Sequence, residues 1–223
     1  MNRLLGKGTY GISEAARFAQ VNPGTARQWI RGRGRAQKRL LKPDIPPLQD
    51  SFALSFLDLI DLLVVGRFRE AGVSLQTLRK VYSRLRSTLG SVHPFSHHLL
   101  LTDGKTVFLE TLDDIGDKQL EEVLSGQRAM PQVLLPYLKQ VEYSQSSQIA
   151  ERWNIFPGVV IDPHRSFGKP VITDAGTTTY VLARAFRANE ENAEIVADLF
   201  DVTVDAVEKA VAFEREYGRR KAA

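Results

Sequence analysis

The feature that most constrains this chain is a helix junction at Asn22-Pro23, which separates two short helical patterns between residues 10 and 31. Asparagine is a favourable N-cap, and proline fits the first turn of a helix, where its missing N–H costs nothing. We expect Ser13 to cap the first helix. The pattern predicts a helix-turn-helix in which Trp29 and Ile30 face the core.

A basic stretch rich in glycine and proline follows over residues 31–47, and it predicts a loop or wing rather than a helix. Residues 1–50 carry ten lysines and arginines against three carboxylates, a net of +7. The rest of the chain therefore holds −3 of the total of +4. Positive charge gathered on one surface favours binding to phosphates. A solvated basic face would have the same composition.

Recognition of DNA needs long polar side chains that reach base edges and neighbouring cations that hold the phosphates. The second helix and the basic stretch supply both kinds, and a helix N-terminus can itself meet a phosphate. The candidate DNA-binding residues are Asn22, Thr25, Arg27, Gln28, Arg31, Arg33, Arg35, Lys38 and Arg39. The alternative is a helical pair that only packs, which the excess of positive charge makes the weaker interpretation.

A capping-box pattern at Ser55 and Asp58 predicts a strongly apolar helix that extends to about Glu70. Gly72 ends this helix, and Ser74 caps the next one. In that next helix a seam of apolar residues recurs at steps of three and four: Leu75, Leu78, Tyr82, Leu85 and Leu89. The seam is expected either to form a dimer contact or to pack in the core against residues 56–68.

The middle of the chain predicts a β-hairpin over residues 98–109, around Asp103-Gly104, and Ser144–Gln148 is the best candidate for a linker. Residues 153–161 predict an extended apolar segment. Three helices follow over residues 179–188, 191–200 and 203–217. Their expected buried stripe comprises Ala193, Ile195, Val196, Leu199, Val204, Val207, Val211 and Phe213.

The predicted fold class is mainly α with a small β component. It comprises an N-terminal winged helix-turn-helix, a central β-hairpin region and a C-terminal homeodomain-like three-helix bundle. We expect a DNA-binding domain over residues 1–90, an αβ connector over 91–150 and a helical domain over 151–223.

Several function classes are disfavoured. The chain contains no cysteine, which excludes disulfides, thiolate catalysis and cysteine-based zinc sites. Pro94 disfavours a shared helical face for His93 and His97, and neither a nucleophile elbow nor a phosphate-binding glycine motif is present. We therefore expect no catalytic residue, metal or cofactor, and no enzyme. No apolar run is long enough to span a bilayer, so a cytoplasmic protein without membrane contact is expected.

The first part of the chain resembles the MerR-like winged helix-turn-helix. The matching segments are Tyr10–Ala16, Val21–Trp29, Phe56–Leu59 and Arg69–Leu75, whereas residues 33–47 replace the usual wing signature. Many MerR-like proteins are dimers, and the resemblance implies a homodimer that would read two DNA half-sites.

The last part resembles a small helical domain of formerly unknown function that is common in bacterial antitoxins. The matching segments are Ile161–Pro163, Arg165–Ile172, Thr177–Thr179 and Ala193–Glu214. The two resemblances in this order are similar to the longer VapB-type antitoxins. Together they cover about residues 8–90 and 153–217.

The resemblance implies an antitoxin that neutralises a PIN-type (VapC-like) ribonuclease toxin and autorepresses its operon by binding operator DNA. Antitoxins of this type present cations to the acidic site of the toxin. The candidates here are Arg165, Lys169, Arg215, Arg219, Arg220 and Lys221. Two alternatives stay open: a free-standing MerR-like transcription regulator that responds to a small ligand, and a protein–protein adaptor with no nucleic-acid role.

Overall fold

The computed structural model describes residues 6–32, 39–49, 51–102 and 130–218. The chain divides into two compact units, which are described separately. One comprises residues 10–151, and the other comprises residues 152–223 together with 1–9. The division into three domains therefore stays a prediction. About half of the chain is helical and the sheets are small, in agreement with the predicted mainly α class with a β component.

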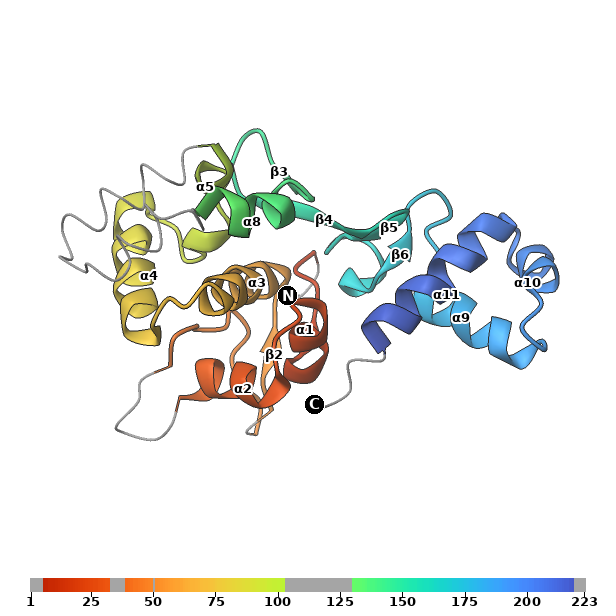
Figure 1. The fold of residues 1–223 in the computed structure, drawn as a ribbon, viewed down its shortest axis with the longest axis horizontal. Coiled ribbons are helices and arrows are strands. Elements are labelled where there is room, and N and C mark those ends of the chain that lie inside the picture. The colour runs from red at the N-terminus through yellow and green to blue at the C-terminus, as the bar shows by residue number, and fades with distance from the viewer. Residues whose placement is uncertain (1–5, 33–38, 50, 103–129, 219–223) are drawn as a thin grey trace. The chain divides into compact units, whose positions relative to one another are not determined.

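The first unit contains most of the helices (Figure 1). Its elements are β1 (Tyr10–Gly11), α1 (Ile12–Phe18), α2 (Pro23–Arg31), β2 (Ala53–Leu54), α3 (Phe56–Glu70), α4 (Leu75–Leu89), the 3-10 turn η1 (Pro94–Ser96), α5 (Leu99–Thr102), α8 (Met130–Leu138) and β3 (Val141–Tyr143). The strand β4 (Ala150–Phe156) begins at the end of this unit.

The helix pair α1 and α2 forms where the sequence predicts it. The Asn22 side chain accepts hydrogen bonds from the backbone N–H groups of Gly24 and Thr25, and Pro23 occupies the first turn of α2. Helix α1 begins two residues earlier than expected: Gly11, not Ser13, is its N-cap, and Ser13 lies inside the helix. Strands β1 and β2 pair antiparallel, so the start of α1 is tied to the start of α3.

Helix α3 is the centre of the first unit. Ser55 and Asp58 form the expected capping box, and nearly every residue from Phe56 to Phe68 is buried. The helix approaches the turn between α1 and α2 closely at Gly66, where a Cβ atom would lie 2.6 Å from Cγ2 of Val21. Glycine is therefore required at this position by packing, although it is a poor helix former.

The apolar seam of α4 faces the core of its own unit. Leu78, Tyr82 and Leu85 are buried, and the Tyr82 ring meets Phe95 of η1 edge-on, with ring centroids 5.3 Å apart. Core packing therefore accounts for the middle of the seam. A homodimer stays a prediction, and it would need a surface other than these three side chains.

Two expectations for the middle of the chain are corrected. Leu99–Thr102 form a helical turn, α5, instead of the start of a hairpin strand, and the rest of that predicted hairpin (residues 103–109) lies outside the described residues. Ser144–Gln148 are the turn between β3 and β4 rather than a linker: Ser144 N–H donates to the carbonyl of Ile149 at 2.9 Å. Short apolar runs do not distinguish helix from strand, and polar residues suit a tight turn as well as a linker.

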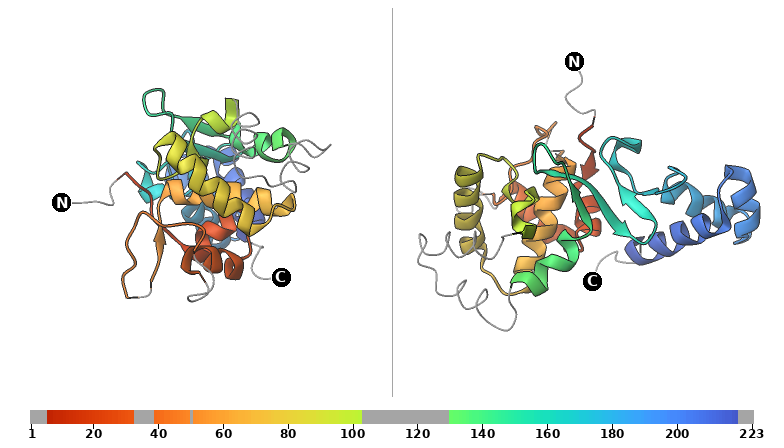
Figure 2. Two further views of the ribbon diagram at one scale, coloured as in Figure 1. Left: turned by 90° about the vertical axis from the view of Figure 1, so that its left-hand side faces the viewer. Right: turned by 90° about the horizontal axis from the view of Figure 1, so that it is seen from above.

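The second unit packs three helices beside a small antiparallel sheet. Its strands are the end of β4, β5 (Val159–Ile161) and β6 (Val171–Ile172), and its helices are α9 (Thr179–Ala188), α10 (Ala193–Phe200) and α11 (Val204–Gly218), with a 3-10 turn η2 (Ser166–Gly168) between β5 and β6. Helices α9 and α11 pack side by side (Figure 1 and the right-hand view of Figure 2). Thr179 at the start of α9 donates a hydrogen bond of 2.7 Å to Glu214 of α11.

The predicted buried stripe of this unit is partly wrong. Val196, Val207, Val211 and Phe213 are buried, but the side chains of Ile195, Leu199 and Val204 are exposed, with 46%, 63% and 38% of their surface accessible. Helical periodicity places these residues on shared faces, but it does not tell which face another element covers. Across the described residues, no helix has the length and apolar content needed to cross a membrane.

Candidate nucleic-acid interface

The outer face of α2 presents the long polar side chains expected of a recognition helix. Arg27, Gln28 and Arg31 are exposed, whereas Ala26, Trp29 and Ile30 on the opposite face are buried. Residues three and four apart lie together on a helix, so these three polar side chains form one continuous patch. We call Arg27, Gln28 and Arg31 the α2 patch.

The other two candidates on α2 have structural roles as well. Asn22 is exposed, but its side-chain oxygen already accepts two backbone hydrogen bonds, of 2.9 and 3.2 Å. Thr25 is half-buried. Asn22 therefore orders the N-terminus of α2 and leaves its amide group for a phosphate or base.

The basic stretch begins and returns at the carboxyl end of α2. Gly32 ends the helix with a positive φ of 78°, which favours glycine, and the N–H groups of Leu40 and Leu41 both donate to the carbonyl of Trp29. Arg39 is exposed, directly before the buried Leu40. Arg33, Arg35 and Lys38 lie outside the described residues. The two described cations that flank them, Arg31 and Arg39, are both accessible.

The guanidinium of Arg31 also lies 5.0 Å above the ring of Phe52, just before β2. Stacking on an aromatic ring leaves the edge of the guanidinium open for hydrogen bonds to an anion. The chemistry of this face is therefore that of anion binding: an amide, two exposed guanidinium groups on one helix, and a third at Arg39.

Arg67 of α3 anchors the helix pair from behind. It is buried, and its Nη2 donates to the carbonyl of Ala19 at the end of α1 over 2.8 Å. Its Nη1 donates to Glu70 and to the hydroxyl of Tyr137 in α8, whose ring lies 4.6 Å from the guanidinium carbon. One side chain thus joins α1, α3 and α8, and it contributes no charge to the surface.

A buried ionic cluster holds the chain after the basic stretch. The ring of His93 lies between Asp61, whose Oδ2 is 3.0 Å from Nδ1, and Asp44, whose Oδ1 is 3.1 Å from Nε2. Asp58 is 3.8 Å from Nδ1, and it also accepts the backbone N–H of Asp44 at 3.1 Å. Ser96 and Tyr82 donate to Asp61. Asp44 is thereby fixed against α3.

In this cluster, burial and the neighbouring carboxylates shift the pKa of His93 in opposite directions. Burial alone would lower the pKa of His93, but the hydrogen bonds and charges of Asp44, Asp61 and Asp58 raise it to about 10. Burial raises the pKa of Asp58 to about 6 and also raises that of Asp61. We conclude that His93 is a cation at neutral pH and that its charge is neutralised internally.

Sequence reasoning did not find this cluster. Its signal was present, because Asp58 and Asp61 are carboxylates three residues apart inside an otherwise apolar helix. Such residues need a buried partner. His93, treated in the sequence only as a weak metal candidate, is that partner. No group of histidine and carboxylate side chains among the described residues has the arrangement of a metal site.

The six expected toxin-binding residues differ in their exposure, and three of them are not described by the structure. Arg165 is exposed, and Lys169 is half-buried with its Nζ 3.4 Å from the carbonyl of Thr9. Arg215 is exposed and lies 3.7 Å from Glu191. Arg219, Arg220 and Lys221 fall outside the described residues. Of the three toxin-binding candidates that the structure describes, Arg165 and Arg215 are therefore the fully exposed cations.

These features define a mainly helical chain of two small units with an exposed cationic helix face in the first. Residues 159–213, within the second unit, match a family described as protein of unknown function (DUF433). Along most of its length the chain is 26% identical to a protein of Mycobacterium tuberculosis (strain H37Rv) described as "Putative antitoxin VapB45". That match runs over 221 residues, 91% of this chain and 92% of the relative.

A solved structure has the same fold. The crystal structure of Rv2018 from Mycobacterium tuberculosis superimposes with a TM-score of 0.73 at 25% identity, and the match covers 91% of this chain and 96% of that one. The comparisons support the antitoxin resemblance of the whole chain rather than of one unit.

Proposed function

We propose that this chain is the antitoxin of a toxin–antitoxin pair, that its first unit binds operator DNA and that its second unit binds a PIN-type ribonuclease. The observation that carries the proposal is the similarity to the VapB45 protein over nine-tenths of both chains. In this proposal the chain is a regulator, not an enzyme, and it acts in the cytoplasm.

The α2 patch supports the DNA-binding part. A helix whose N-terminus is capped by a side chain, whose inner face is buried and whose outer face carries two arginines and a glutamine can lie in a major groove. Arg39, which precedes two residues bonded to the carboxyl end of that helix, adds a third exposed cation, and the sequence before it supplies further basic residues. Phosphate contacts from these cations would supply most of the affinity, and Arg27 and Gln28 would supply the base readout.

The toxin-binding part is supported by charge. A PIN-type ribonuclease holds its metal with carboxylates, and an arginine that enters such a site competes with metal and with RNA phosphate. Arg165 and Arg215 are exposed cations of the second unit, and the basic residues at the end of the chain add three more. We propose that these groups approach the acidic site of the toxin.

The DNA-binding part is tested with the purified full-length chain and the DNA upstream of its own reading frame. Fluorescence anisotropy at several salt concentrations should give a log–log slope that reports the number of phosphate contacts. A scrambled duplex of equal length is the control. Equal affinity for both duplexes, or affinity that does not change with salt, would contradict the proposal.

The toxin-binding part is tested separately with the protein encoded by the neighbouring reading frame. Co-expression should give a stable complex, and the chain should inhibit cleavage of RNA by that protein. Deletion of residues 219–223 should weaken the complex and leave DNA binding intact. If DNA affinity responded to a small molecule and not to the neighbouring protein, the chain would instead be a ligand-responsive regulator.

A further inference from the structure

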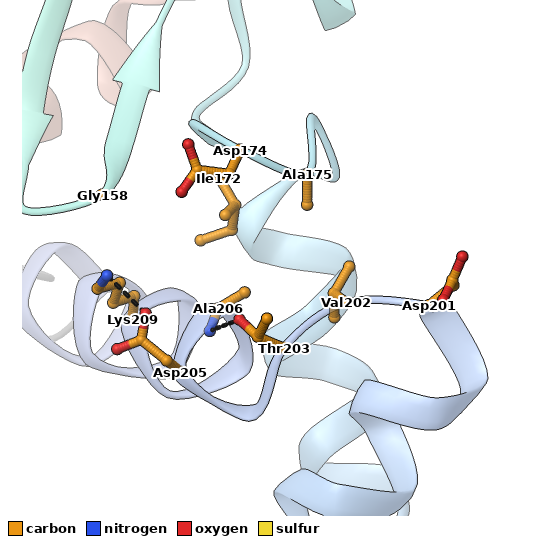
Figure 3. A pocket seen from close by; sticks show the side chains of 10 residues that line it. All are labelled: Gly158, Ile172, Asp174, Ala175, Asp201, Val202, Thr203, Asp205, Ala206 and Lys209. Atoms are coloured by element: carbon orange, nitrogen blue, oxygen red, sulfur yellow. Dashed lines mark hydrogen bonds and ion pairs between the residues drawn. The ribbon is translucent and has the colours of Figure 1, made fainter.

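The second unit contains a groove between the strand turns and the turn that joins α10 to α11 (Figure 3). Gly158, Ile172, Asp174 and Ala175 form one wall, and residues 201–203 with Asp205 and Ala206 form the other. Lys209 lies at one end. The groove has a volume of about 390 Å³, which is large enough for one long side chain and parts of the residues on either side of it in a peptide.

The local backbone keeps this groove open. Asp201 ends α10 in a left-handed conformation (φ 51°), and the hydroxyl of Thr203 accepts the N–H of Ala206, which caps the next helix. On the opposite wall Thr173 N–H donates to the carbonyl of Gly158 at 3.0 Å. At Gly158 a Cβ atom would lie 2.7 Å from Cδ of Lys209, so the absence of a side chain there lets the lysine stem pack across the end of the groove.

The lining is apolar in its depth and acidic at its edge. Ile172 and Ala206 are buried, while Asp174, Asp201 and Asp205 are exposed. Lys209 is paired with Asp205, Nζ to Oδ2, at 2.6 Å. Neither Asp174 nor Asp201 has a side-chain hydrogen-bond partner within the described parts of the chain. Two carboxylates therefore stand open beside an apolar floor.

The segment that contains the second wall of the groove is acidic along its length. Residues 193–208 carry five carboxylates and no lysine or arginine. The apolar side chains of Leu199, Phe200 and Val204 are exposed on the same segment. Single exposed apolar residues are ordinary, but an exposed group of them beside a groove is typical of a protein contact.

Charge decides what can occupy this surface. Duplex DNA is disfavoured because phosphates would meet five carboxylates, although α10 and α11 have the order of a helix-turn-helix. A second copy that docked on the same face would place carboxylates opposite carboxylates. A cationic partner satisfies both the open carboxylates and the apolar floor, because arginine and lysine combine an apolar stem with a charged end.

We propose that this groove is a docking site for a protein segment in which an arginine or lysine side chain stands next to an apolar residue. The cation pairs with an open carboxylate at the edge of the groove, Asp174 or Asp201, its stem lies on the apolar lining, and the apolar neighbour packs on Leu199 and Val204. This site goes beyond the proposed function, since it requires neither DNA binding nor a nuclease as the partner.

The test uses the full-length chain and a library of short random peptides as the probe. Peptides selected on the wild-type chain should be enriched in arginine or lysine beside leucine, phenylalanine or valine. The strongest selected peptide is then measured by anisotropy against D174N/D201N. Asparagine keeps the size of the side chain and tolerates the left-handed backbone at Asp201. We expect about a tenfold loss of affinity and a weaker dependence on salt.

Matched variants separate a specific site from general charge and apolarity. E151Q/E216Q removes two exposed carboxylates elsewhere, and L48S removes an exposed leucine of the first unit, so both should bind like wild type. L199S should lose affinity. Thermal unfolding of every variant checks that the fold is retained.

Four results would overturn the docking site. They are a library without any binder, selected peptides without cations, equal binding by D174N/D201N, and self-association of the wild-type chain that L199S abolishes in sedimentation. The DNA affinity of all variants should stay at the wild-type value, so failure here is distinguishable from failure of the proposed function.

Discussion

His93 Nδ1 lies 3.0 Å from Asp61 Oδ2 in a site where both side chains are closed to solvent. The pair joins α3 to the turn after α4, and through Asp44 it also fixes the chain that follows the basic stretch. A contact between residues 32 positions apart thus fixes α3, the turn after α4 and the segment at Asp44 against one another. The charge state of this contact can be tested by pH.

We predict that the free energy of unfolding falls as the pH rises above about 6.5. The pKa of His93 is raised from 6.5 to about 10, so between these values the folded chain holds a proton that the unfolded chain has released. Each pH unit in this window costs up to about 1.4 kcal/mol. The raised pKa of Asp58, about 6, acts in the same direction between pH 4 and 6. Urea unfolding at a series of pH values measures the slope.

H93Q should flatten the alkaline part of this dependence and lower stability at pH 7, because it leaves buried carboxylates without their cation. H164Q is the control, since His164 is exposed in the other unit. An H93Q chain with the wild-type slope between pH 7 and 10 would show that another group carries the dependence.

Arg67 gives a second prediction. R67M removes the donors to Ala19, Glu70 and Tyr137 at once, and it leaves the carbonyl of Ala19 without that partner. We expect a loss of about 3–5 kcal/mol in the free energy of unfolding. R67K keeps the charge but lacks the planar fork that reaches three acceptors, so we expect an intermediate loss. R187M, an exposed position on α9, should have almost no effect, and a similar loss there would contradict a specific role of Arg67.

Gly66 gives a prediction whose sign separates packing from helix propensity. Alanine is the better helix former by about 1 kcal/mol, so G66A would stabilise the chain if propensity prevailed. The Cβ atom would lie 2.6 Å from Cγ2 of Val21, so we expect destabilisation of about 1–3 kcal/mol instead. The double variant V21A/G66A should recover much of the loss. Additive effects in a double-mutant cycle would show that the two positions do not touch.

Features that depend on neighbouring residues could be predicted from the sequence. The caps at Asn22, Ser55 and Ser74 set the starts of α2, α3 and α4, and all three were predicted, because a cap is a contact within three residues. The bounds of α9, Thr179–Ala188, were also predicted, because the local sequence pattern of this segment agrees with the helix that it forms.

Contacts between distant segments were not predictable in this way. The partners of His93 are 32 to 49 positions away, so no spacing rule connects them. The exposure of Leu199 and Val204 depends on which elements cover α10 and the start of α11, and periodicity is the same for a covered and an open face. The inner face of α2 and the apolar helix α3 followed from the sequence, whereas the role of the α4 seam, the buried ion cluster and the open groove of the second unit required coordinates.

On the proposed DNA surface, the exposed residues of α2 should read the base sequence, whereas the cations of the basic stretch should contact phosphates. Arg27 and Gln28 are exposed in the middle of α2, where base edges would be reached, so R27A and Q28A should reduce the preference for the upstream site over a scrambled duplex by about 1–3 kcal/mol each. Removal of Arg33, Arg35 and Arg39 together should instead weaken both duplexes alike and flatten the salt dependence, because phosphate contacts carry no sequence information. Anisotropy titrations on both duplexes measure the two effects, with R187A as a control that removes a cation of α9. If R27A and Q28A left the preference unchanged while both remained folded, the readout would have to come from another surface of the first unit.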